Sequence, residues 1–424
     1  MRSLEWLTAR DACFRGGGVE MRIKSLAAAG LLAAIAFAGT VPAYAQMKAK
    51  QFNILMLTDL SSVYSETSGP GDVEFAKMAV DDFGGKVNGV PINVIVVDNK
   101  LDPALSVNKA REIIDSQGVN LITDVSSSAA AIAIAKLANE RHILTTFVSP
   151  GTMALTNEAC GKYTWHYGYD TSAMSAPVKK MTQDGTKKWY FITADFAFGK
   201  SLLASFSSAV KQNGGEVVGV DMVPFPNDDF SSYLLKAQAA GAEAIGILES
   251  GQDLRNAVKQ AREFGLMDAG IKIVPGQLNL SDVKALGPDT WAGVNAALIW
   301  YWDLDDETRK FTKRFREKLS FYPGDIHAGN YSAVYQVLKA VQEIGTDDPD
   351  KVTEALEGRR FSDMFTKDAL MRKRDHLVVK RTFIGQVKPA SEVKNDSDFF
   401  NIVGSVPGDE AYYPEAESTC KHDW

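Results

Sequence analysis

Apolar strand-like segments alternate with helical ones from residue 52 onward, and this alternation constrains the fold more than any other feature. Residues 52–60, 91–99 and 119–125 are largely apolar runs. Between them, residues 73–83 and 104–118 repeat apolar side chains at helical spacing. Strands that are apolar on both faces are typical of parallel sheets covered by helices. The sequence therefore predicts an α/β fold with a doubly wound parallel sheet.

The same alternation starts again after an aromatic-rich segment at residues 163–169, where we expect the chain to cross into a second lobe. The expected strands are 187–193, 216–223, 242–250 and 271–277, and the expected helices are 199–215, 228–241 and 253–266. Two such series predict two doubly wound, Rossmann-like α/β lobes.

The last third of the chain is expected to return to the first lobe. Residues 291–304 are predicted to be the returning strand, helices follow at 306–320, 327–345 and 348–358, and residues 369–387 alternate polar and apolar side chains like a hairpin. Repeated crossing predicts a multi-segment hinge and a cleft that closes on a ligand. We expect lobe 1 to comprise residues 50–165 and 297–363, lobe 2 residues 169–294 and 366–402, and a tail residues 403–424.

The N-terminal region has the features of an export signal. Residues 21–24 are a short basic start, residues 26–39 form an apolar run too short to cross a bilayer, and residues 43–45 form an A-x-A cleavage site. We expect residues 21–45 to be a signal peptide and the mature protein to be periplasmic. Residues 1–20 are interpreted as a mis-called start. A transmembrane anchor is the disfavoured alternative, because no other stretch approaches 18 consecutive apolar residues.

Charge and cysteine content limit the partners of the mature chain. Of 46 Lys and Arg and 53 Asp and Glu, residues 1–45 hold five and three, which leaves 41 and 50. This negative balance argues against binding to nucleic acid and to an anionic membrane surface. Direct membrane insertion is not expected either. Cys160 and Cys420 remain, and in an oxidising compartment we expect them to form one disulfide that ties the tail to the body. Two free thiols are the alternative.

Three consecutive serines, Ser126, Ser127 and Ser128, precede a helix-forming run of small residues. They are predicted to occupy the N-cap and first turn of that helix, where free N–H groups, hydroxyls and the helix dipole favour an anion. The next turn contains Gly151, which leaves the backbone open to close approach. Neighbouring turns at the carboxyl edge of a parallel sheet predict a carboxylate site. An ordinary capped helix beside an ordinary turn is the alternative.

Phe196 and Phe198 follow the strand at 187–193 of the second lobe. Residues 194–201 end in Gly-Lys-Ser like a phosphate-binding loop, but Ala194 stands where that loop needs glycine. We therefore predict that the two phenylalanines form an apolar wall facing the serine turn across the cleft. The alternative is that both lie in the core.

The sequence lacks the motifs typical of catalysis or metal binding. Its five histidines are scattered, and it has no GxSxG, HExxH or CxxC motif. We expect a binding protein rather than an enzyme, without a cofactor and without a metal.

With the export signal, the two lobes and both turns in place, the chain resembles the periplasmic substrate-binding proteins of branched-chain amino acid type ABC transporters. The resemblance covers nearly all of the mature chain, and its most specific parts are GDVEFAKMAV (71–80), VSSSA (125–129) and SPGT (149–152). It implies the type I periplasmic binding fold of the Leu/Ile/Val-binding proteins, with a ligand held between the lobes.

The resemblance also implies ligand contacts. The carboxylate would be held by Ser126, Ser127, Ser128, Gly151 and Thr152, an aromatic residue at Phe198 would cover the ligand, and Glu249 and Gln277 lie on loops that often bind an ammonium group. Amino-acid binders usually have an acid where this chain has Gln277. Because a buried ammonium without an anion is costly, an aromatic or aliphatic acid lacking an α-amino group is favoured. Its planar body would be contacted by Tyr64, Phe196, Phe198 and Tyr301.

The expected function is that of the extracytoplasmic component of an ABC importer, a monomer that delivers a small carboxylate to an inner-membrane permease. A branched-chain or hydrophobic amino acid is kept as an alternative ligand. A ligand-sensing domain of the same architecture, regulating a partner protein, is the alternative function.

Overall fold

The computed structural model describes residues 46–421 and 424. The expected mis-called start (1–20) and the expected signal peptide (21–45) lie outside the described residues. Among the helices of the described part, none combines the length and the apolar character that crossing a membrane requires.

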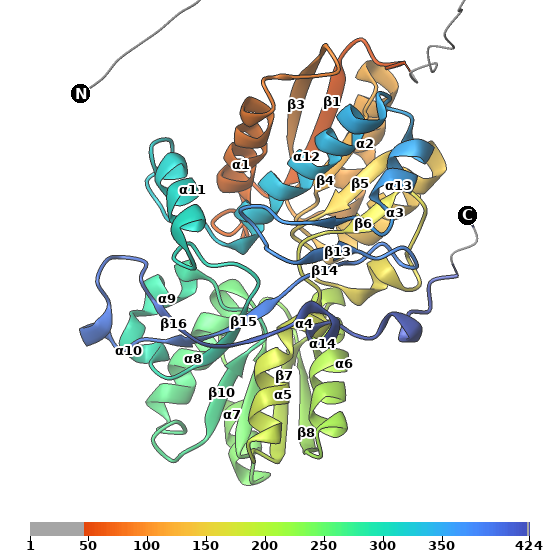
Figure 1. Cartoon of the computed structure of the whole chain (residues 1–424). Coiled ribbons are helices and arrows are strands. Elements are labelled where there is room, and N and C mark those ends of the chain that lie inside the picture. Colours follow the sequence, from red (N-terminus) through yellow and green to blue (C-terminus); the bar gives the residue numbers. More distant parts are fainter. Residues whose placement is uncertain (1–45, 422–423) are drawn as a thin grey trace, which may run out of the picture. The chain divides into compact units, whose positions relative to one another are not determined.

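The first lobe is built on a six-stranded sheet in the order β2-β3-β1-β4-β5-β6. All of its neighbouring pairs are parallel except β2 with β3. Figure 1 shows these strands with helices packed around them. The strands are β1 (Phe52–Thr58), β2 (Lys86–Val87), β3 (Val90–Asp98), β4 (Leu121–Asp124), β5 (Leu144–Phe147) and β6 (Thr164–His166).

Helices cover both faces of this sheet because its strands are apolar on both faces. In β1, Ile54 and Met56 belong to the apolar core that includes Phe75 of α1, whereas Leu55 and Leu57 belong to a separate core. That second core is shared with α2 and α3. The helices of this lobe are α1 (Gly69–Asp82), α2 (Pro103–Gln117), α3 (Ser128–Arg141), α11 (Asp306–Arg316), α12 (Asp325–Ile344) and α13 (Pro349–Leu356).

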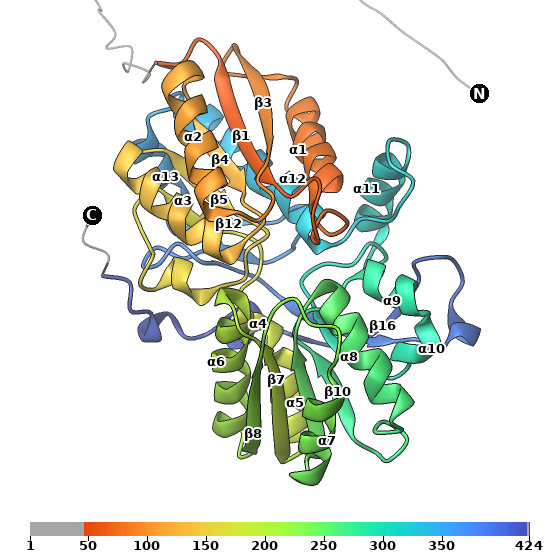
Figure 2. The ribbon, with the colours of Figure 1, turned by 180° about the vertical axis from the view of Figure 1, so that it is seen from behind.

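The second lobe repeats the pattern with a four-stranded, all-parallel sheet in the order β10-β9-β7-β8. Figure 2 shows these strands beside α6, α7 and α8. The strands are β7 (Lys188–Ala194), β8 (Glu216–Val223), β9 (Ala244–Leu248) and β10 (Lys272–Pro275). The helices are α4 (Thr171–Met174), α5 (Ala176–Gln183), α6 (Ala197–Gln212), α7 (Ser231–Ala239), α8 (Gly251–Glu263), α9 (Leu280–Leu286) and α10 (Pro288–Trp291). The predicted pair of doubly wound lobes is confirmed.

The strand predicted to return to the first lobe does not enter that lobe's sheet. β11 (Asn295–Leu298) pairs antiparallel with β15 (Thr382–Val387), which in turn pairs with β16 (Phe400–Val406). Antiparallel pairing with β15 satisfies the backbone hydrogen bonds of β11. The chain therefore reaches α11 and α12 without adding a strand to the sheet of the first lobe. The expected hairpin is present as β13 (Ala369–Met371) and β14 (Val378–Val379), with β12 (Arg360–Phe361) completing a small sheet.

Other elements were not anticipated. The segment expected only as a crossover, residues 163–169, contains the edge strand β6, and η1 (Met153–Thr156) precedes it. Helix α1 begins at Gly69, although Gly69-Pro70-Gly71 reads as a helix breaker. Proline is tolerated in the first helical turn because that turn's N–H groups have no intrahelical partner.

The C-terminal tail is held against the body of the protein. Cys160 and Cys420 form a disulfide in the structure, with Cα atoms 5.8 Å apart. Ser418 Oγ donates to the Thr156 carbonyl at 2.8 Å, and the Tyr413 hydroxyl donates to the Asp375 carboxylate at 2.8 Å. The remaining short elements are η2 (Ala390–Glu392), α14 (Gly408–Ala411) and η3 (Glu415–Glu417).

Candidate functional site

The serine turn joins the carboxyl end of β4 to the start of α3. Asp124 and Val125 take left-handed backbone angles, with φ of 73° and 61°, and turn the chain sharply out of the sheet. Ser127 is the N-cap of α3, and its hydroxyl accepts from Ala130 N–H at 3.4 Å. Ser128 is the first residue of the helix. The serines therefore lie at the positive end of a four-turn helix, as the sequence predicts.

The three serine hydroxyls differ in how far internal contacts occupy them. Ser126 Oγ accepts from Asp59 N–H at 2.9 Å and lies 3.2 Å from Thr58 Oγ1 and 3.3 Å from Asp124 Oδ2. Ser128 Oγ makes no hydrogen bond within the described residues. Ser126 thus links the ends of β1 and β4 by hydrogen bonds, whereas the hydroxyl of Ser128 is available to bind a ligand.

The neighbouring turn follows β5 and contributes Ser149, Pro150 and Gly151. Ser149 Oγ donates a hydrogen bond to Asp124 and thereby links the two turns. Within the described part of the chain, no hydrogen bond occupies the backbone N–H of Ser128 or of Gly151. Uncharged donors from two adjacent strand ends consequently lie side by side.

Two buried carboxyl groups stand behind the serine turn. Burial, together with the charge of Asp124, raises the pKa of Asp72 well above its usual value. Burial also raises the pKa of Asp124, while bonds from Ser149 and Thr58 act in the opposite direction. Two carboxyl groups buried side by side disfavour the ionised form of each other. Asp124 holds the turn in place through its bonds from Ser126 and Ser149, and neither carboxyl group lines the cleft cavity.

The second lobe presents Phe196 and Phe198 at the start of α6. Phe196 is the N-cap residue and lies against Phe225, with ring centroids 4.7 Å apart. Phe198 is buried against Gly151, where an added Cβ would lie 2.6 Å from Phe198 Cε2 and 2.7 Å from Tyr169 Cε2. Glycine at position 151 is therefore what allows the two lobes to approach each other here.

Three polar side chains complete this part of the cleft. The hydroxyl of Tyr64, from the first lobe, lies 2.9 Å from Ser250 Oγ of the second. The Tyr169 hydroxyl donates to the Ser149 carbonyl at 2.9 Å and accepts from Gln277 Nε2 at 3.0 Å. The lobes are thus in contact across the cleft.

These groups enclose a small cavity of about 40 Å³. No Lys, Arg, Asp or Glu of the described chain lines it, so its polar character comes from hydroxyls, one amide and backbone groups. The lining residues are Tyr64, Thr67, Ser68, Ser126, Ser127, Ser128, Ser149, Pro150, Gly151, Tyr169, Phe196, Phe198, Gln277 and Ile326.

Three residues expected at the site lie elsewhere. Thr152 caps η1, where its hydroxyl accepts from Ala154 N–H at 3.3 Å. Glu249 is 1% exposed, and neither carboxyl oxygen has a hydrogen-bond partner among the described residues. Burial raises the pKa of Glu249 to about 9, and Asp253 adds to the effect. Tyr301 donates to the Ser397 carbonyl at 3.1 Å and lines a different cavity.

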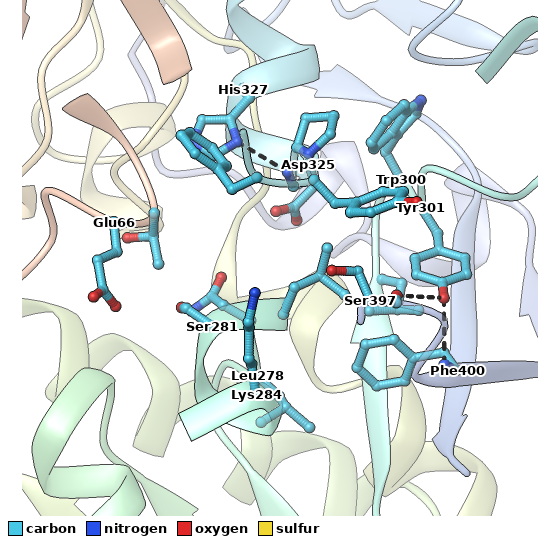
Figure 3. A pocket seen from close by; sticks show the side chains of 18 of the residues that line it. Glu66, Leu278, Ser281, Lys284, Trp300, Tyr301, Asp325, His327, Ser397 and Phe400 are labelled. Carbon is cyan, nitrogen blue, oxygen red and sulfur yellow. Dashed lines mark hydrogen bonds between the residues drawn. The ribbon is translucent and has the colours of Figure 1, made fainter. Parts of the chain in front are cut away.

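That second cavity is larger, about 530 Å³, and also lies between the lobes. Figure 3 shows Trp300, Tyr301 and Phe400 gathered on one side of it, with Asp325 near them and Lys284 opposite. It shares Thr67 with the small cavity. Gln277 of the small cavity is followed in sequence by Leu278 of the large one, and Ile326 of the small cavity lies between Asp325 and His327 of the large one.

Several lining residues were missed from the sequence. Tyr169 lies in the aromatic-rich crossover, shortly before α4. That position was the only feature of the sequence that could have indicated a role in the cleft. Thr67 and Ile326 come from a loop and from a helix start that are distant in sequence, so no local pattern connects them. No cluster of His, Cys, Asp or Glu suited to a metal ion occurs within the described residues.

The family model described as periplasmic binding protein matches residues 51–394. A leucine-, isoleucine-, valine-, threonine- and alanine-binding protein of Pseudomonas aeruginosa is 23% identical over 68% of this chain and 77% of its own length.

Solved structures agree with this match. A periplasmic binding protein from Burkholderia mallei is 36% identical, with a TM-score of 0.84 over 88% of this chain and 100% of that chain. A solute-binding protein of an ABC transporter from Rhodopseudomonas palustris, solved with 3,4-dihydroxybenzoic acid, has a TM-score of 0.75 and 24% identity over 85% of this chain and 98% of that chain. Such relatives are extracytoplasmic solute-binding proteins rather than enzymes. With a match over most of its length and two doubly wound lobes around a cleft, the chain belongs to the periplasmic binding protein family.

Proposed function

We propose that this protein is the solute-binding component of an ABC importer and that it binds a small carboxylate in the interlobe cleft. The observation that carries the proposal is the small cavity, in which unpaired donors of the first lobe face the phenylalanines of the second. The proposed contacts are Tyr64, Ser126, Ser127, Ser128, Gly151, Phe196, Phe198 and Gln277.

A carboxylate suits this cavity for electrostatic reasons. Ser128 contributes a hydroxyl and an N–H, Gly151 contributes an N–H, and α3 points its positive end at the same place. Donors fixed by the fold bind an anion without the reorganisation that a flexible Lys or Arg side chain requires. Ser126 acts through its bonds to Asp59 and Asp124, which hold the turn in the binding geometry.

The cavity gives little support for an α-ammonium group. Its lining contains Gln277 and no carboxylate, and Glu249 lies outside it with a pKa near 9, which leaves that side chain neutral at physiological pH. An acid without an α-amino group is therefore the favoured ligand, either aromatic, as in the Rhodopseudomonas complex, or aliphatic. The branched-chain amino acids named for the Pseudomonas relative are the second choice.

Ligand delivery follows from the two-lobe design. A ligand that contacts both lobes favours the closed form over the open one, because only the closed form makes both sets of contacts. An importer's permease could then distinguish loaded from empty protein. We assign the mature protein to the periplasm, with residues 21–45 as the export signal and an inner-membrane permease as the partner.

The test begins with a thermal-shift screen of benzoates, cinnamates, phenylacetates, short aliphatic acids and branched-chain amino acids, because a ligand of the native state raises Tm. The best acid is then titrated by calorimetry into wild type and into Ser128→Ala. Loss of a hydrogen bond to a charged group costs about 1.5–3 kcal/mol, so affinity should fall roughly 10- to 150-fold. Unchanged affinity would remove the serine turn from the site.

A control guards against an indirect effect. Ser127→Ala removes an N-cap and is expected to lower stability by about 1 kcal/mol in addition to any effect on binding. Ser128 has no such internal role, so Ser128→Ala should keep the wild-type Tm while it weakens binding.

A further inference from the structure

The small cavity is too small for a whole ligand in the closed structure. A cavity needs about 10–15 Å³ for each water, so about 40 Å³ holds a carboxylate group but not the body of the molecule. The adjoining cavity of about 530 Å³ has the size of a ligand pocket and borders the small one at Thr67. The body of a carboxylate ligand held at the serine turn would extend into this adjoining space, and its lining shows what that body should be.

The aromatic side chains of the large cavity present rings rather than polar atoms. Trp300 Nε1–H donates to the Met364 carbonyl at 2.9 Å. The Tyr301 hydroxyl donates to the Ser397 carbonyl and accepts from Phe400 N–H at 3.4 Å. With these polar atoms already paired, Trp300 and Tyr301, like Phe321 and Phe400, present ring surface to the cavity. Tyr322 also lines it, but the Arg316 guanidinium already covers that ring at 4.1 Å.

The charged side chains that line the large cavity differ in whether an opposite charge lies beside them. Glu66 lies 4.0 Å from Arg255, and Lys284 lies 3.2 Å from Asp396. Asp325 accepts from the Ile326 N–H at 3.0 Å but has no Lys, Arg or His nitrogen within 4.0 Å among the described residues. Burial raises its pKa to about 6, so the side chain is ionised above neutral pH. Lys380 acts on Asp325 only from beyond ion-pair distance, so one carboxylate at the start of α12 faces the aromatic cavity without a cation of the described chain in contact.

We propose that this aromatic cavity is a second subsite, which takes a positively charged amine or quaternary ammonium group at the far end of the carboxylate ligand. An unpaired carboxylate beside aromatic rings is the combination that recognises alkylated nitrogen cations, because the ring faces and the carboxylate both attract positive charge. The inference rests on the proposed function, since the ligand's acid group is held at the serine turn.

The experiment compares acids that differ only at their far end. Butyrate, hexanoate and octanoate are titrated into the whole mature protein at pH 8, each beside its ω-trimethylammonio derivative. Wild type should prefer the cationic member of at least one pair by roughly tenfold or more, the effect of a desolvated cation–π contact. Equal affinity within every pair, or the absence of binding by all six acids, would overturn the inference.

Three variants locate the effect. Asp325→Asn should reduce the preference for the cationic acid to roughly threefold or less, and Phe321→Leu should reduce it in the same direction. Lys284→Gln removes the cation on the opposite wall and should increase the preference. Asp268→Asn is the matched control, because it removes one negative charge from a surface position that lines neither cavity.

The two proposals fail in distinguishable ways. If Ser128→Ala weakens both members of a pair equally while Asp325→Asn and Phe321→Leu leave the preference unchanged, the carboxylate site stands and the cation subsite is wrong. If the cationic acid binds through Asp325 but Ser128→Ala has no effect, the serine turn is wrong and the subsite stands as a separate site. Tm values of the unliganded variants show whether Asp325→Asn retains the fold, and Phe321→Leu provides the second reading if it does not.

Discussion

Gly151 allows the two lobes to approach each other closely because it has no side chain. Its backbone angles suit any residue, so the constraint is space alone: a Cβ would lie 2.6 Å from the Phe198 ring and 2.7 Å from the Tyr169 ring. Both rings are buried and cannot move aside freely.

We expect Gly151→Ala to impair closure and to lower affinity for the bound acid by roughly tenfold or more, since overpacking of this kind costs about 1–3 kcal/mol. Calorimetry measures the change. Gly404→Ala is the control, because an added Cβ there meets only an ordinary contact at 3.8 Å. Equal effects of the two substitutions would show that the Gly151 contact does not control closure.

Glu249 makes stability depend on pH. Its folded-state pKa of about 9 lies above the unfolded value near 4.5, so the folded protein binds the extra proton between these limits. Stability from this residue therefore falls as pH rises from about 5 to 9.

Glu249→Gln should flatten that decline by up to about 1.4 kcal/mol per pH unit, the value for one proton. Urea denaturation at pH 5, 6, 7, 8 and 9 gives the slope, with Glu263→Gln as an exposed control. Parallel slopes for wild type and Glu249→Gln would mean that the buried carboxyl titrates normally.

At the scale of elements, the strands and most helices follow from local pattern, whereas their ends depend on neighbours. Helix α1 begins at Gly69, where φ is +59° and a Cβ would lie 2.7 Å from the Asp59 carbonyl. A Cβ on Gly71 would lie 2.5 Å from the His327 ring of α12. Gly69 and Gly71, whose sequence reads as a helix breaker, allow the start of α1 to pack closely against the end of β1 and against α12.

The tail is an element held by a covalent bond and by side-chain hydrogen bonds. The disulfide closes a loop of 260 residues and joins the tail to the segment between η1 and β6. Loss of a native disulfide typically costs about 2–5 kcal/mol, mainly through the larger conformational entropy of the unfolded chain.

We expect a reducing agent to lower the free energy of unfolding of wild type by an amount in that range and to leave Cys160→Ser with Cys420→Ser unaffected. Denaturant titrations with and without the reductant measure both. If wild type does not respond to the reductant, the disulfide either is not formed or does not contribute to stability.

At the scale of the whole molecule, the site exists only where two lobes meet. The Tyr64–Ser250 hydrogen bond crosses that boundary, so it contributes to closure and to nothing within either lobe. A neutral hydrogen bond contributes about 0.5–1.5 kcal/mol.

Tyr64→Phe keeps the ring but loses this bond, so we expect affinity to fall roughly 2- to 10-fold and the unliganded protein to be more open. Calorimetry measures the first effect and small-angle scattering the second. Tyr233→Phe, on α7 outside both cavities, is the control. A lower affinity without any change in scattering would assign Tyr64 to ligand contact rather than to closure.

The sequence alone determined the two-lobe α/β fold and the serine turn, because strand periodicity, helix caps and small residues act over a few neighbouring positions. It could not determine that Thr152 caps η1, that Glu249 is buried outside the cavity, or that β11 pairs with β15. Nor could it place Asp325 and Trp300 in one cavity beside the carboxylate site. These facts depend on contacts between segments far apart in the chain, which are fixed only when the lobes pack and the remaining space between them takes its shape.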